Sequence, residues 1–306
     1  MTAVDVPGLR EVVAEQPYRL LFATVSGAHL YGFPSADSDV DLRGVHLLPA
    51  DEVIGLRHGP ETLERMWLRD GVELDLVTHD LLKFVRLLLR PNGYVLEQLL
   101  SPLVVQTSDA HAELAGHAAG CITRRHAHHY RGFAHTQWQL FGRNNELKPL
   151  LYTFRALLTG INLMRTGVIE ADLSVLVESL DGPSFLPELI AAKAAGEHLT
   201  LTGGPSPEQL WQTYEQWLAE LVAAQEKSTL PEQPSAEPQL HDFVVRLRLR
   251  RSPSRAAGAG SGPRRRRRRA PPARGGTPAP SGTSRPARPG RPAWSWGTRR
   301  RPAGTR

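Results

Sequence analysis

The chain has 306 residues, with 37 lysines and arginines against 31 aspartates and glutamates, a formal net charge of +6. Residues 251–306 hold 16 of the arginines and no acidic residue, so residues 1–250 carry 21 basic and 31 acidic side chains, a net charge of −10. An acidic body argues against non-specific wrapping of a long nucleic acid, which needs a basic surface.

The chain shows no sign of secretion or membrane insertion. Its single cysteine, Cys121, excludes a disulfide framework and indicates a reducing compartment. No apolar run reaches the roughly 18–20 residues of a membrane span, and the first residues lack the basic and apolar regions of a secretory signal. We therefore expect a soluble, cytoplasmic protein with no membrane partner.

The first third of the chain predicts strands followed by a helix. Four segments have strand patterning, at residues 18–26, 38–48, 62–69 and 72–78. Asp70-Gly71 separates the last two and is a strong hairpin signal. Apolar residues then repeat at helical spacing from Leu81 to Leu89, and Pro91-Asn92-Gly93 ends that helix.

The rest of the body predicts helices, over residues 109–142, 147–166 and 206–227. Ser206-Pro207-Glu208 opens the last one as an N-cap followed by proline at the first helical position. We expect an α+β fold. A domain with a small mixed β-sheet and flanking helices covers 1–108, a helical domain covers 109–228, and a linker with a short apolar segment covers 229–250.

The arginine-rich tail, residues 251–306, holds 10 of the 25 prolines and 9 of the 27 glycines, with six consecutive arginines at Arg264–Arg269. This composition cannot form a core and predicts disorder. It is compatible with a nucleic-acid tether or a localisation signal. It is also what GC-rich DNA yields when translated in the wrong frame, and because that interpretation weighs more, we assign the tail no function.

Paired carboxylates form the most informative pattern. Asp39 and Asp41 are two apart in a predicted strand and point to the same side, where they repel each other unless a cation neutralises them. Carboxylate oxygens suit Mg²⁺, and a later strand, with Glu73 and Asp75 on a shared side, offers a third ligand for a two-metal site. Gly27 ends a strand where a helix could begin, a place suited to a phosphate. The alternative is an ordinary pair of solvated aspartates.

The string Ser26-Gly27-Ala28-His29-Leu30-Tyr31-Gly32, followed by Asp37–Val45, resembles the DNA polymerase beta-type nucleotidyltransferase superfamily. The superfamily pattern is Gly-[Ser/Gly], seven to thirteen residues, then Asp-x-[Asp/Glu], with a further Asp on a later strand. The fuller string is similar to a bacterial branch of predicted nucleotidyltransferases associated with RNA-repair operons. The resemblance covers residues 20–225 and is strongest over 24–45.

The resemblance implies roles for individual residues. Asp39, Asp41 and Asp75 match the catalytic, metal-binding aspartates, and the third helps to activate the attacking hydroxyl. Gly27 matches the glycine that lets the triphosphate approach, so Ser26, Gly27 and Ala28 are expected to bind the nucleotide. Ala28 stands where a phosphate-contacting serine is common, and one lost hydrogen bond costs about 0.5–1.5 kcal/mol. Arg43, on the strand face of Asp41, either contacts phosphate or pairs with a neighbouring carboxylate.

The implied activity is transfer of a nucleoside monophosphate, expected to be AMP from ATP, to a hydroxyl of an acceptor with release of pyrophosphate. Two Mg²⁺ ions serve as cofactors, and the acceptor is an RNA end, a small molecule or a protein. One alternative is a catalytically weakened relative that binds nucleotide or RNA. The other is a protein-modifying transferase component of a toxin–antitoxin-like pair.

Overall fold

The computed structural model describes residues 8–69 and 71–249, which fall within one compact unit that ends at Pro253. The arginine-rich tail, for which the sequence predicts disorder, lies outside the described residues. Within the described ranges, no helix has both the length and the apolar character that a membrane crossing requires.

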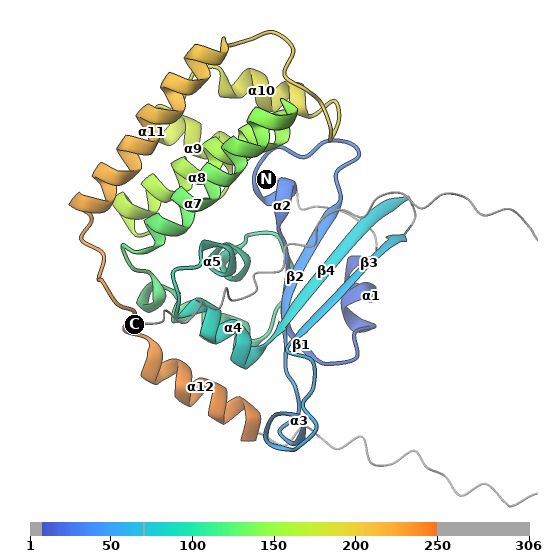
Figure 1. Cartoon of the computed structure of the whole chain (residues 1–306). Helices are drawn as coiled ribbons and strands as arrows, with labels where there is room; N and C mark the ends of the chain where they lie inside the picture. Colours follow the sequence, from blue (N-terminus) through green and yellow to red (C-terminus); the bar gives the residue numbers. More distant parts are fainter. Residues whose placement is uncertain (1–7, 70, 250–306) are drawn as a thin grey trace, which may run out of the picture. The chain divides into compact units, whose positions relative to one another are not determined.

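A mixed β-sheet organises the first part of the chain (Figure 1). Its five strands are β1 (Leu20–Val25), β2 (Val40–His46), β3 (Thr62–Arg69), β4 (Val72–Asp80) and β5 (Val104–Gln106). Their order is β3-β4-β2-β1-β5, with β2 and β4 parallel and the other neighbours antiparallel. The predicted mixed sheet and the predicted β3–β4 hairpin are confirmed, whereas the short edge strand β5 was not predicted.

Helices cover both faces of the sheet. Leu42 of β2 and Leu76 of β4 lie in one hydrophobic cluster with Leu9 of α1 (Leu9–Ala14), so α1 covers that face. On the opposite face, Val45 of β2 packs in a cluster with residues of α4 (Leu81–Leu88) and α5 (Gly93–Leu100), as Figure 1 shows. The short helix α3 (Asp51–Ile54) follows β2.

The stretch predicted as one helix over 109–142 is divided. It forms α6 (Asp109–Gly116), a 3₁₀ turn η1 (Ala118–Cys121) and α7 (His126–Asn144). Gly116 and Gly120 lie at the interruption, where glycine weakens helical backbone, and Ile122 is extended with ψ 130°. The continuous-helix prediction was wrong at this point.

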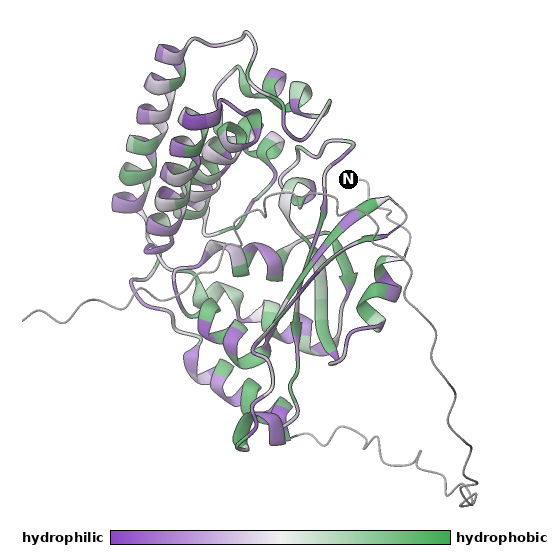
Figure 2. Ribbon diagram, turned by 45° about the vertical axis from the view of Figure 1, so that its right-hand side comes forward, coloured by the Kyte–Doolittle hydropathy of each residue, from purple (hydrophilic) through white to green (hydrophobic). Residues whose placement is uncertain are grey.

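The remaining predicted helices are present. Helix α8 (Leu147–Thr166) ends at Gly167, whose φ of 73° is left-handed, and α11 (Pro207–Lys227) begins with a capping box between Ser206 and Gln209. Two shorter helices between them, α9 (Leu173–Leu180) and α10 (Leu186–Lys193), were not predicted. Figure 2 shows hydrophobic residues along the central strands and mixed character along α7 and α11.

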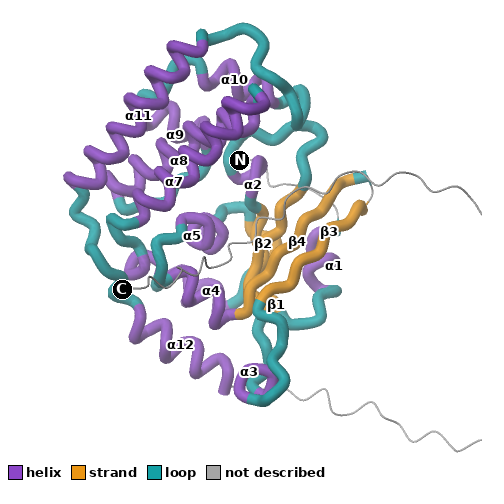
Figure 3. The backbone as a smooth tube through the Cα atoms, viewed as in Figure 1, coloured by secondary structure: helices purple, strands orange, loops and turns teal. Residues whose placement is uncertain are grey.

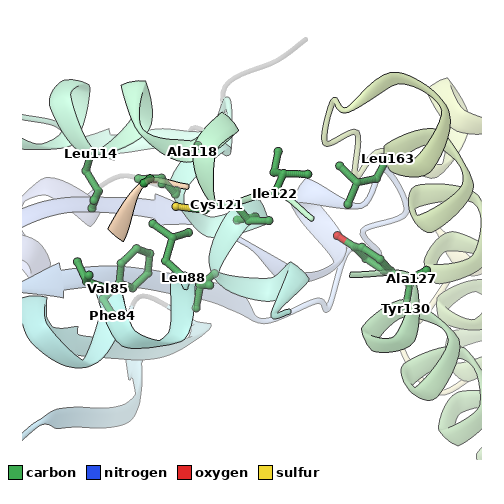
Figure 4. Packing of buried hydrophobic residues seen from close by; sticks show 14 of the residues in the cluster. Phe84, Val85, Leu88, Leu114, Ala118, Cys121, Ile122, Ala127, Tyr130 and Leu163 are labelled. Atoms are coloured by element: carbon green, nitrogen blue, oxygen red, sulfur yellow. The ribbon is translucent and has the colours of Figure 1, made fainter. Parts of the chain in front are cut away.

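One large hydrophobic cluster joins the sheet to these helices (Figure 4). It contains Phe84 of α4, Leu114 of α6, Tyr130 of α7 and Leu163 of α8. Cys121 is buried in the same cluster, and burial raises the pKa of its thiol to about 11. The cysteine is therefore a core residue in its protonated form.

Residues 240–249, expected to be a short apolar segment after a linker, lie within the helix α12 (Glu237–Leu249). Leu240 and Phe243 are buried in the large cluster. Arg248 bonds both carboxylate oxygens of Asp80, the N-cap of α4, at 2.5 and 2.6 Å. These contacts make α12 part of the folded unit.

Candidate active site

Two of the three predicted aspartates meet on adjacent parallel strands. Asp41 of β2 is directly paired in register with Asp75 of β4. Paired residues of neighbouring strands point to the same face of a sheet. Here that face is the one covered by α4 and α5, because Leu42 and Leu76 point to the α1 side.

Arg43 holds these two carboxylates together. Its Nη2 donates to Asp41 Oδ1 at 2.5 Å and to Asp75 Oδ2 at 2.9 Å, while Nη1 donates to the Asp75 carbonyl oxygen at 2.7 Å. The three side chains keep 17–23% of their surface exposed. Of the two interpretations open from sequence, the pairing with neighbouring carboxylates is the one found.

Asp39 lies immediately before β2 and is close enough to affect Asp41. The pKa of Asp41 is raised to about 6, chiefly by burial, with further raising by the charges of Asp39 and Asp75. Arg43 and, from α8, Lys148 act in the opposite direction. The surroundings of Asp41 therefore disfavour its negative charge, and the pairing with Arg43 partly offsets this effect.

The Gly27 turn lies against the same carboxylate. Gly27 opens the short helix α2 (Gly27–Leu30) with a left-handed φ of 63°, as expected for a strand that ends where a helix begins. A Cβ on Gly27 would lie 1.8 Å from Asp41 Oδ2, so only glycine fits. The Ser26 amide donates to the Asp41 carbonyl oxygen at 2.8 Å, which fixes the turn on β2.

Ala28 is a core residue. Its side chain is 4% exposed and belongs to a hydrophobic cluster that includes Phe33 and Leu151. A serine hydroxyl at this position would enter an apolar environment, which accounts for alanine here.

Sequence reasoning missed a charged cluster centred on Glu197, in the segment after α10. Its carboxylate accepts hydrogen bonds from Lys193 at 2.7 Å and from Ser38 at 3.0 Å, and it forms a close ion pair with Lys148. Burial acts to raise the pKa of Glu197, but the hydrogen bonds and charges of Lys148 and Lys193 outweigh it and lower the pKa to about 2. His29 is close to Glu197 and Asp39, and burial lowers its pKa. The spacing of these residues along the chain gave no signal of the cluster.

A second cluster that sequence reasoning missed lies behind the Gly27 turn. Arg155 of α8 donates to Glu97 of α5 at 2.9 Å, and both side chains are 1% exposed. The hydroxyls of Tyr31, which follows α2, and Tyr130 of α7 donate to the same carboxylate at 3.0 and 3.1 Å. The guanidinium carbon of Arg155 also lies 3.9 Å from the centroid of the Tyr31 ring. This cluster connects the turn to three helices.

The carboxylates suit a hard divalent cation, although they do not surround a common point. In the described part of the chain, no three His, Cys, Asp or Glu side chains are arranged to hold a metal ion. Arg43 occupies one oxygen of Asp41 and one of Asp75. Asp39 and the remaining oxygens are of the type that Mg²⁺ prefers. The donor chemistry therefore fits Mg²⁺, provided that the Arg43 guanidinium turns away.

The chain belongs to the RNA repair pathway DNA polymerase beta family, whose sequence profile matches residues 1–246. It is therefore a nucleotidyltransferase-type protein of the polymerase beta class.

The chain is also similar to individual proteins. An uncharacterized protein of Methanocaldococcus jannaschii is 35% identical over 166 residues, which are 54% of this chain and 67% of that protein. The uncharacterized protein YcgL of Bacillus subtilis is 28% identical over 198 residues, covering 61% of this chain and 75% of YcgL. A crystal structure of a nucleotidyltransferase-like protein from Exiguobacterium sibiricum is 14% identical. It covers 78% of this chain and 76% of its own, with a TM-score of 0.27.

Proposed function

We propose that this protein transfers a nucleoside monophosphate, AMP from ATP, to a hydroxyl group of an acceptor and releases pyrophosphate. The observation that carries the proposal is the paired register of Asp41 and Asp75, with the Gly27 turn against the Asp41 carboxylate. Family membership supports the same class of reaction. The first acceptor to test is an RNA end, and the net charge of −10 over residues 1–250 favours a short one.

We propose that Asp39, Asp41 and Asp75 hold two Mg²⁺ ions. When bound, these ions would neutralise charge on the attacking and leaving oxygens. The chain's own groups do the rest. Ser26, Gly27 and Ala28 would offer their backbone to the triphosphate at the turn beside the Asp41 carboxylate, and Asp75 would take the proton of the acceptor hydroxyl. The new bond joins the acceptor oxygen to the α-phosphorus, and the bond to pyrophosphate breaks.

Arg43 has a defined place in this scheme. A metal ion held by Asp41 and Asp75 would replace its guanidinium on these carboxylates, and the guanidinium would remain on the same sheet face because Arg43 belongs to β2. There it can donate to phosphate oxygens of the nucleotide, because guanidinium binds phosphate as readily as carboxylate. Arg43 would then pair with carboxylates before the nucleotide binds and contact phosphate afterwards, which are the two roles considered from sequence.

We assign the sheet part, residues 1–108, to nucleotide binding and the helical part, residues 109–228, to the acceptor side. We place the activity in the cytoplasm, as the use of a single cysteine in the whole chain suggests.

The test uses the full chain with Mg²⁺ and ATP labelled either on the α- or on the γ-phosphorus, together with short RNAs, small hydroxyl compounds or protein. We expect the α-label alone to move to an acceptor. Asp41→Asn should lower transfer by at least about 100-fold, since a positioned charge in a catalytic site contributes several kcal/mol. Asp242→Asn, at an exposed position on α12, is the matched control and should transfer normally.

Other outcomes identify the alternatives. ATP binding without label transfer would indicate a weakened, nucleotide-binding relative. Label transfer confined to one cognate protein would indicate a protein-modifying component of a toxin–antitoxin-like pair. Transfer of the γ-label would contradict the proposal, because a phosphoryl group, and not a nucleotidyl group, would be moving.

A further inference from the structure

The loop before β2 carries Asp39 and is fixed by the helical part of the chain. Asp39 precedes the first residue of β2, so the strand pairing that holds Asp41 begins just after it. Within the described residues, the Asp39 carboxylate accepts no hydrogen bond. Its position therefore depends on the loop that leads to it.

Two serines give this loop its shape. The Ser38 amide donates to the Ser35 carbonyl oxygen at 3.0 Å, and the Ser35 amide donates to Ser38 Oγ at 2.9 Å. These reciprocal bonds close a turn directly before Asp39. Both serines are buried.

Glu197 binds both serine hydroxyls from about 160 residues away in sequence. Its Oε2 accepts from Ser38 at 3.0 Å and from Ser35 at 3.2 Å. Lys193, which is fully buried, donates to the same oxygen at 2.7 Å and to Ser35 Oγ at 2.9 Å. The loop between α2 and β2 and the loop after α10 lie side by side in Figures 1 and 3.

The other oxygen of Glu197 binds Lys148 of α8. Lys148 keeps 27% of its side-chain surface exposed and acts electrostatically on Asp41. Glu197 therefore pairs with the positive charge of Lys148, which the aspartates would otherwise attract. If the negative charge of Glu197 were removed, Lys148 would be free to pair with the aspartates and compete with a divalent ion.

We propose that Glu197 is a positioning residue for Asp39. It holds the Ser35–Ser38 turn so that the Asp39 carboxylate faces Asp41, and it keeps Lys148 away from both carboxylates. The inference rests on the proposed function only in that it takes Asp39 and Asp41 to be ligands of a divalent cation.

The test measures Mn²⁺ affinity, which needs neither nucleotide nor acceptor. Free Mn²⁺ is followed by electron paramagnetic resonance in titrations of the full chain. We expect Glu197→Gln to weaken Mn²⁺ binding by about 10- to 100-fold, because it removes hydrogen bonds to a charged group. Ser38→Ala, which leaves the Lys193–Glu197 pair intact, should weaken it by about 2- to 10-fold. Glu220→Gln breaks an exposed ion pair with Arg165 and should leave the affinity unchanged.

A double-mutant cycle separates positioning from general stability. In an Asp39→Asn background, Glu197→Gln should have a much smaller further effect on Mn²⁺ affinity, because the group that it positions is no longer a charged ligand. Equal effects in both backgrounds would overturn the inference. If Glu197→Gln fails to fold, as judged by circular dichroism, the same cycle with Ser38→Ala decides.

The two proposals fail in different ways. If the unmodified chain binds no Mn²⁺, the metal-dependent function is contradicted, and the positioning role with it. If the unmodified chain binds Mn²⁺ and both the Glu197 and Ser38 variants bind it equally well, only the positioning role is overturned. A lowered melting temperature with unchanged Mn²⁺ affinity would show that the cluster merely stabilises the fold.

Discussion

Arg155→Met removes the positive charge that pairs with Glu97 in the cluster behind the Gly27 turn. Arg155 Nη1 lies 2.9 Å from Glu97 Oε1, and both side chains are 1% exposed. The substitution leaves a buried carboxylate with two tyrosine hydroxyls as its remaining side-chain donors. Breaking one partner of such a pair costs about 3–5 kcal/mol, because the other charge stays buried and uncompensated.

Urea and thermal unfolding measure this cost. For a folded unit of this size, each kcal/mol shifts Tm by about 2–4 °C, so we expect a drop of about 6–20 °C. Arg165→Met is the matched control on the same helix. Its pair with Glu220 is more than 40% exposed on both sides and contributes at most about 1 kcal/mol.

The double variant Glu97→Met, Arg155→Met completes the experiment. Because it removes both charges, it should cost clearly less than the two single substitutions added together. If Arg155→Met destabilised the protein no more than Arg165→Met, the reasoning about the buried pair would be refuted. Strict additivity in the double variant would contradict it as well.

Three further predictions concern the turn, the Glu197 cluster and α12. Gly27→Ala should abolish nucleotide binding and transfer, because its methyl group would lie 1.8 Å from a carboxylate oxygen of β2. Gly71→Ala, with a similar positive φ but open space around it, should retain both, as filter binding and label transfer would reveal. Glu197 contributes up to about 3 kcal/mol of stability above pH 4.5, which is lost as the pH falls toward its folded-state pKa of about 2. The stability difference between the unmodified chain and Glu197→Gln, measured with urea, should therefore shrink across that range, and a constant difference would argue against it. Phe243→Ala should cost about 3–5 kcal/mol because the ring is buried, whereas Val245→Ala, at 41% exposure, should cost far less; similar costs would show that α12 does not belong to the core.

Local patterns explain what could be predicted from sequence. Some signals lie within a few consecutive residues. They are the alternation around Asp41, the hairpin residues at 70–71 and the helical periodicity of α8. The juxtaposition of Asp41 and Asp75 was predictable because a strand fixes which side chains share a face. Asp39, however, lies just before β2 and not within the strand as its pattern predicted, so its role in the site stays a prediction.

Contacts between distant segments could not be predicted in the same way. Glu197 meets Ser38 across 159 residues, and Glu97 meets Arg155 across 58, and neither pair leaves a periodic trace in the chain. The prediction of one long helix over 109–142 was wrong. The helical spacing of apolar residues continues through Gly116 and Gly120, but the backbone leaves α-helical geometry there. Helix α12 is short and depends on burial of Phe243 for its place in the fold, which a local pattern does not reveal.

The most direct test of the central claim is a crystal structure of the full chain with Mn²⁺ and a non-hydrolysable ATP analogue. Anomalous scattering locates Mn²⁺ independently of the protein. We predict anomalous peaks within coordination distance of Asp39, Asp41 and Asp75, with Arg43 turned from the carboxylates toward the phosphates and the triphosphate lying along the Gly27 turn. Nucleotide bound elsewhere, or Arg43 still joining Asp41 to Asp75 with no metal beside them, would contradict the account.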